Sequence, residues 1–102
     1  MIYYNIKIQI QKHEENRWLK WMYEKHIKDV LKTECFQTCI IYKEDEKNTY
    51  IIQYKCENRK KLKRYFDNFY SKLKKEHEIL FKNQFTASRY ITELIKKIQP
   101  LD

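Results

Sequence analysis

The chain has 102 residues, a formal net charge of +8 at pH 7, and 42% hydrophobic and 16% aromatic residues. These fractions exclude an intrinsically disordered chain, and the length predicts one domain over residues 1–102 with a single core. The absence of glycine excludes glycine-rich phosphate loops and glycine-dependent nucleophile elbows.

Apolar and polar side chains alternate strictly over residues 2–11. The apolar face of this segment carries Ile2, Tyr4, Ile6, Ile8 and Ile10. The pattern predicts a strand with one buried face. A signal peptide needs a continuous apolar segment, which this alternating segment lacks. No apolar run in the chain approaches the roughly 20 residues of a membrane span. We therefore expect a cytoplasmic protein.

A helix is predicted from about Glu15 to Lys32. At about 100° per residue, its apolar stripe contains Trp18, Met22 and Val30, and His26 lies in the middle of that stripe. An ionisable ring at this position needs an explanation, because an aliphatic side chain would pack better there. Trp21 lies on the flank of the stripe and is interpreted as a packing residue, with a pocket rim or a dimer contact as alternatives.

Two further strands are predicted over residues 35–43 and 49–56, and the short loop between them indicates a hairpin. With the turn centred on residue 46, Tyr42 lies opposite Tyr50 and Ile40 lies opposite Ile52. Both faces of the hairpin then carry apolar residues. The three cysteines are interpreted as reduced, buried small side chains: Cys35, Cys39 and Cys56.

Asn58 is predicted to cap a second helix that runs from Arg59 to about Glu78. His77 extends the apolar stripe of this helix. It is predicted either to cap the helix end, where a cation is favourable, or to face the same cavity as His26. Residues 85–95 predict a fourth strand, followed by a short terminal helix over residues 91–98.

The order strand, helix, strand, strand, helix, strand predicts an α+β fold, the ferredoxin-like sandwich. Right-handed crossovers place two helices on one face of a four-stranded antiparallel sheet. Because the opposite face still carries apolar residues, we expect a homodimer that buries this face against a second copy, as a dimeric α+β barrel.

Several short motifs resemble an uncharacterised bacterial family, domain of unknown function 4286. They are W-L-x-W-M-x-x-x-H-I, C-F, Y-x-x-Q-Y-x-C-E, R-Y and L-x-x-x-H. The family usually has proline and glycine where this chain has Lys28 and Glu34. The resemblance implies a dimeric α+β-barrel-like fold and no established activity. The residues that carry it are Trp18, Leu19, Trp21, Met22, His26, Ile27, Cys35, Phe36, Tyr50, Gln53, Tyr54, Cys56, Glu57, Arg64, Tyr65, Leu73 and His77.

His26 has two interpretations. It is a core histidine satisfied by a backbone carbonyl or a tyrosine hydroxyl, or a neutral pocket residue that acts as a base or hydrogen-bond donor toward a small metabolite. The pocket would lie between the first helix and the sheet. Whether the protein only binds that metabolite or also isomerises or oxidises it stays open. Neither a metal nor a cofactor is predicted, because no second ligand stands at metal-binding spacing. The predicted ligand-binding residues are Trp18, Met22, His26, Gln53, Asn5 and His77.

The alternative is a non-catalytic basic module that associates with RNA or a protein partner. Tyr3, Tyr4, Tyr50 and Tyr54 lie on the first and third strands, where RNA-recognition domains of this topology stack bases. Part of the basic excess is compositional, because lysine dominates over arginine throughout the chain. The cations of this alternative are Lys55, Arg59, Lys60, Lys61, Lys63 and Arg64.

Overall fold

A computed structural model describes residues 1–45 and 47–101, and its elements follow the predicted order. The four strands are β1 (Ile2–Ile10), β2 (Thr38–Lys43), β3 (Thr49–Cys56) and β4 (Phe85–Glu93). The first helical region comprises a 3-10 turn η1 (Lys12–Glu14), α1 (Glu15–Trp21), a π-helical turn η2 (Met22–His26) and α2 (Ile27–Lys32). The second comprises α3 (Arg59–Asn68) and α4 (Tyr70–Leu80).

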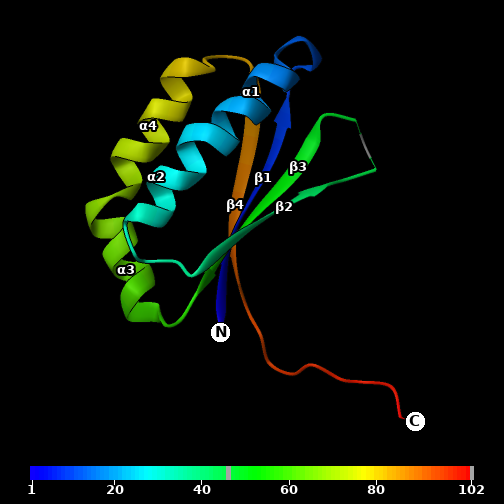
Figure 1. The fold of residues 1–102 in the computed structure, drawn as a ribbon, viewed down its shortest axis with the longest axis vertical. Coiled ribbons are helices and arrows are strands. Elements are labelled where there is room, and N and C mark those ends of the chain that lie inside the picture. The colour runs from blue at the N-terminus through cyan, green and yellow to red at the C-terminus, as the bar shows by residue number, and fades with distance from the viewer. Residues whose placement is uncertain (46, 102) are drawn as a thin grey trace.

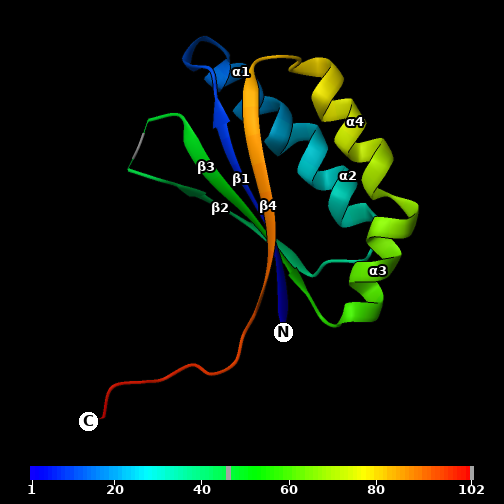
Figure 2. The same cartoon turned by 180° about the vertical axis from the view of Figure 1, so that it is seen from behind.

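The strands form one antiparallel sheet in the order β2-β3-β1-β4. Both helical regions cover the same face of this sheet, and the opposite face carries no helix (Figures 1 and 2). This arrangement confirms the ferredoxin-like prediction. None of the helices within the described residues has the length and apolar composition needed to span a bilayer.

The core lies between the helices and the inner face of the sheet. β1 occupies a central position, and its predicted apolar face is buried there as expected. Trp18, Val30 and Phe81 are the helix-side counterparts, each at most 1% exposed. Cys35 and Cys56 are buried and Cys39 is half-buried, and all three are free thiols.

The first helix contains a π turn that keeps one row of side chains over the sheet. Residues spaced by four drift about 40° per step around an α-helix. A π turn takes more residues per turn, so it subtracts from this drift. The Ile27 N–H bonds to the carbonyl of Met22, five residues earlier. Met22 and Val30 are therefore both buried, with His26 between them.

The predicted register of the β2–β3 hairpin is wrong by one residue. Tyr42 lies opposite Ile51 instead of Tyr50. The Glu44 N–H bonds to the carbonyl of Thr49 at 2.9 Å. Each β2 residue therefore pairs with the β3 residue that follows its predicted partner. This shift moves every β2 side chain to the other face of the sheet. The predicted turn centre, residue 46, lies outside the described residues.

Several boundaries also differ from the prediction. β2 begins at Thr38, so the predicted strand residues 35–37 precede it. Asn58 caps α3 as expected, because its Oδ1 accepts the Lys61 N–H at 2.9 Å. The second helix breaks at Phe69, whose φ of −126° is not helical.

No helix follows β4 in residues 94–101. Residues 91–93, predicted to begin that helix, instead continue the β4 ladder against the start of β1. The Leu94 N–H then bonds to the carbonyl of Met1 at 2.9 Å. Beyond this bond the chain leads away from the sheet (Figure 1), and Ile95 and Ile98 are exposed.

Three of the residues that the structure describes have the left-handed conformation that a glycine would favour. They are Glu34, Asn48 and Asn83, with φ of 63°, 64° and 61°. Asparagine tolerates this conformation better than most residues do. Glu34 is the unusual member, and it follows the end of α2 at the position where the resembled family usually has glycine.

Candidate functional site

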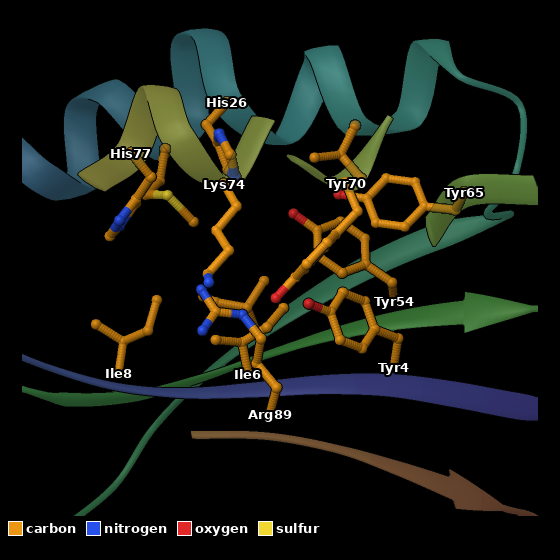
Figure 3. Close-up of a pocket in the computed structure, with 13 residues that line it drawn as sticks. Tyr4, Ile6, Ile8, His26, Tyr54, Tyr65, Tyr70, Lys74, His77 and Arg89 are labelled. Atoms are coloured by element: carbon orange, nitrogen blue, oxygen red, sulfur yellow. The ribbon is translucent and has the colours of Figure 1, made fainter. Parts of the chain in front are cut away.

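A cavity of about 30 Å³ lies between the helices and the inner face of the sheet. It has room for one or two water molecules. Figure 3 shows that side chains from both layers point into it, among them two histidines, four tyrosines and two cations. The lining residues are Tyr4, Ile6, Ile8, Met22, His26, Val30, Ile52, Tyr54, Tyr65, Tyr70, Lys74, His77 and Arg89.

His77 on α4 is held in one tautomer by Trp18. The Trp18 indole Nε1–H donates to His77 Nε2 at 2.9 Å, and the two residues are 0% and 4% exposed. An indole N–H is only a donor, so Nε2 is the unprotonated nitrogen and the proton of the neutral ring lies on Nδ1. That Nδ1 is buried and has no partner among the described residues.

His26 closes the π turn and lies beside His77, with 5.9 Å between their ring centroids. The Trp21 indole stacks on the imidazole of His26 at 4.8 Å and an interplanar angle of 26°. This stacking fixes the plane of the ring. His26 Nδ1 is buried and, like that of His77, has no hydrogen-bond partner in residues 1–45 and 47–101.

Burial keeps both imidazoles neutral. It lowers the pKa of His26 from 6.5 to about 4, against a smaller opposing effect of the Asp29 carboxylate. Burial lowers the pKa of His77 to about 3, and the positive charge of Arg89 adds to this effect. A histidine with so low a pKa is a weak base near pH 7. The pair is therefore suited to hydrogen bonding more than to proton abstraction.

Tyrosine hydroxyls occupy the other end of the cavity. The hydroxyl of Tyr54 is buried and has no nitrogen or oxygen partner among the described residues, and the Cys39 thiol lies beside it. Burial raises the pKa of Tyr4 to about 12, although the nearby Arg89 guanidinium opposes this shift. These hydroxyls are therefore protonated donors at neutral pH.

Two cations lie where the cavity meets solvent, which we call the mouth of the cavity. Lys74 on α4 and Arg89 on β4 both lie close to the ring of Tyr70, at 5.7 Å and 6.0 Å from its centroid. Figure 3 shows their charged groups turned toward the same space as the hydroxyls of Tyr70 and Tyr4.

The structure brings together only part of the predicted ligand-binding set. Met22, His26 and His77 line the cavity. Trp18 does not line it, but its indole N–H donates to His77. His77 faces the cavity and does not cap the helix end, since its side chain is buried beside His26. Trp21 packs, as predicted, in this case on His26.

Asn5 and Gln53 do not belong to this cavity, because they lie on the opposite face of the sheet. Gln53 Nε2 donates to Asn5 Oδ1 at 3.0 Å across the β1–β3 pair. Asn5 Nδ2 donates to Thr92 Oγ1 at 3.0 Å and to the carbonyl of Tyr90 at 3.3 Å. Both amides are therefore satisfied across the sheet, and their prediction as ligand-binding residues of this cavity is wrong.

The sequence interpretation missed Arg89, Lys74 and Tyr70. The signal for Arg89 was present, because it alternates with Phe85 and Ala87 along β4 and must share their inward face. Lys74 and Tyr70 flank the apolar stripe of the second helix, where periodicity alone does not separate a cavity wall from a solvent-facing surface.

The base-stacking prediction is wrong for three of its four tyrosines. Tyr4, Tyr50 and Tyr54 point toward the helices and are at most 5% exposed, so only Tyr3 lies on the open face. The predicted cations are also partly neutralised. Ion pairs join Arg59 to Glu93, Lys61 to Glu57 and Lys63 to Asp67, and Arg64 donates to the carbonyl of Thr33 at 3.4 Å.

No group of three or more histidine, cysteine or acidic side chains has a metal-binding arrangement in the part of the chain that the structure describes.

Comparisons with known proteins agree with this fold. The model of a family described as domain of unknown function (DUF4286) matches residues 1–95. A comparison with curated proteins finds no match. A dimeric ferredoxin-like protein from an uncultured marine organism has a TM-score of 0.70 at 11% identity, over 98% of this chain and 100% of that chain.

Two other solved structures share the fold. An antibiotic biosynthesis monooxygenase has a TM-score of 0.69 at 7% identity, over 94% of this chain and 100% of that chain. A variant of MhuD with two manganese protoporphyrin IX molecules per active site has a TM-score of 0.67 at 10% identity, over 98% of this chain and 100% of that chain. At these identities the likeness shows the fold alone.

Proposed function

We propose that this chain, which belongs to the DUF4286 family, binds a small molecule in the cavity between its helices and its sheet. Two proteins of the same fold support the binding of a small molecule by what their names state, since one is a monooxygenase and the other holds two manganese protoporphyrin IX molecules per active site.

The observation that carries the proposal is a cluster of three unpartnered polar atoms around one cavity. They are His26 Nδ1, His77 Nδ1 and the hydroxyl of Tyr54, all buried. Buried polar atoms in proteins are nearly always hydrogen-bonded, and leaving one unpaired costs roughly 1–3 kcal/mol. A bound molecule that reaches all three would recover this cost.

The geometry favours recognition over acid–base chemistry. With pKa values of about 4 and about 3, His26 and His77 are neutral hydrogen-bonding groups at pH 7. His77 offers a donor at Nδ1, because Trp18 already donates to its Nε2. The aliphatic walls supplied by Ile6, Ile8 and Ile52 would hold an apolar part of the ligand.

The cavity is too small for most metabolites, so binding requires side chains to move. Tyr70 is the best placed to do so, because it lies at the mouth on the second helix. Rotation of this side chain would enlarge the cavity and leave the histidine pair and both cations in place.

The test is native mass spectrometry of protein purified from cells without denaturation. We expect a bound small molecule that is released on unfolding. Val30→Ile adds one methyl group at the cavity wall and should reduce its occupancy. Ser71→Thr adds one methyl group at an exposed position of α4 and should leave it unchanged. Equal occupancy in Val30→Ile and wild type would contradict the proposal, because the molecule would then lie elsewhere.

The second part of the proposal is a homodimer formed through the outer face of the sheet. Three large side chains point away from the helices and are exposed: Ile40 at 46%, Tyr42 at 45% and Tyr90 at 43%. One similar structure is named as dimeric. Covering this face with a second copy would remove these apolar side chains from water.

The dimer is tested by sedimentation velocity. Ile40→Lys combined with Tyr42→Lys would bring two unpaired charges into the interface, so we expect a monomer. Ile79→Lys alters an apolar side chain on α4 that is 67% exposed and should leave the dimer intact. A wild-type monomer at micromolar concentration would refute this part of the proposal.

A further inference from the structure

We infer that the ligand of this cavity is a small organic carboxylate, whose charged end binds Arg89 and Lys74 at the mouth and whose body lies toward His26 and His77. This inference rests on the proposed function, because it names the class of molecule that the same cavity binds.

Arg89 is the first reason. It projects from β4 on the side of the sheet that the helices cover, and it is only partly exposed. No carboxylate of the described residues forms an ion pair with it, although three cations of α3 do have such partners: Arg59, Lys61 and Lys63. Its neighbours at the mouth are the Tyr4 hydroxyl and the Tyr70 ring, which are uncharged, so the guanidinium has no counter-ion there. Its planar fork fits a carboxylate through two parallel hydrogen bonds.

Lys74 is the second reason. Its ammonium group faces the same space as the Arg89 guanidinium, and both lie within about 6 Å of the Tyr70 ring (Figure 3). Two cations that converge on one cavity repel each other. The only carboxylate paired with Lys74 in residues 1–45 and 47–101 is that of Glu78, at 3.3 Å and one helical turn further along α4. An anion between the two cations would be attracted by both and would offset their mutual repulsion.

The inner half of the cavity excludes a second charge on the ligand. The walls there are aliphatic, and His26 and His77 are neutral. A charged group at this depth would lose its hydration without gaining a counter-ion. The ligand therefore carries its charge at one end only, and hydrogen-bonding groups on its body meet the histidine Nδ1 atoms and the Tyr54 hydroxyl.

The test compares each carboxylate with its neutral amide of nearly the same shape. Acetate, butyrate and benzoate, and their three primary amides, are titrated into the full chain. The imidazole signals of His26 and His77 report binding in ¹⁵N NMR spectra. We expect at least one carboxylate to bind about ten-fold more tightly than its amide, as one charge-assisted bidentate interaction provides.

Variants assign this preference to the mouth. Arg89→Gln should reduce it to about two-fold, and Arg89→Lys, which keeps the charge, should retain part of it. Lys75→Gln removes the same charge from an exposed site on α4 and should retain all of it. Glu78→Gln should tighten carboxylate binding, because it leaves Lys74 without its present partner.

The outcomes separate the two claims. If amides move the histidine signals as strongly as carboxylates do, the carboxylate inference fails and the proposed function stands. If Lys75→Gln lowers the preference as much as Arg89→Gln does, net charge is responsible and the inference also fails. If no probe moves either histidine signal in wild type, the carboxylate inference fails, and the ligand occupancy in native mass spectra decides the proposed function separately.

Discussion

Replacing Trp18 with phenylalanine tests the tautomer assigned to His77. The change removes the indole N–H that donates to His77 Nε2 at 2.9 Å and keeps an aromatic ring in the core. The buried Nε2 then has no donor, which costs about 1–3 kcal/mol. The lost ring volume adds a cavity term, since Trp18 is fully buried and packs on Tyr50 with 5.2 Å between ring centroids. We expect a total destabilisation of roughly 2–4 kcal/mol.

The assay combines denaturant unfolding with ¹⁵N NMR of the imidazoles. In wild type, His77 should be protonated at Nδ1 alone. In Trp18→Phe the ring should populate both tautomers, and the pKa of His77 should rise, because the indole donor no longer opposes the imidazolium form. Trp21→Phe is the matched control, because Trp21 stacks on His26 without holding Nε2 of His77. A wild-type His77 protonated at Nε2 would refute the reasoning.

Two further predictions concern stability. Burial lowers the pKa of His26 and His77, so the unfolded chain binds more protons than the folded chain below pH 6.5. Stability should therefore be complete above pH 6.5 and fall toward pH 4, by at most about 1.4 kcal/mol per pH unit for each histidine. Urea titrations across this range should show the loss, and a His26→Gln, His77→Gln double variant should not. Glu34→Gly should stabilise the chain by roughly 1 kcal/mol, since glycine adopts a φ of 63° without strain. Unchanged or lower stability of Glu34→Gly would show that Glu34 is not strained.

The fold could be predicted from the sequence because β1 alternates without exception and each helical region carries an apolar stripe on one side. The hairpin register could not be predicted. A four-residue loop and a five-residue loop are both compatible with the alternation within β2 and β3, but they give registers that differ by one residue. The terminal helix was predicted over residues 91–98, but residues 91–93 of this range pair with the backbone of β1 instead.

The candidate site was predicted in part. His26 stood out because it interrupts an apolar stripe, and His77 because it extends one. Asn5 and Gln53 were grouped with them, although the alternation of β1 and β3 already placed these amides on the opposite face. The hydrogen bond from Trp18 to His77 spans 59 positions of sequence, so no local pattern indicates it.

The most direct test of the central claim is a high-resolution crystal structure of protein purified from cells. We predict non-protein density in the cavity within hydrogen-bonding distance of His26 Nδ1, His77 Nδ1 and the Tyr54 hydroxyl. A cavity closed by its own side chains, with each of these three atoms bonded to another protein atom, would contradict the claim that this is a binding site.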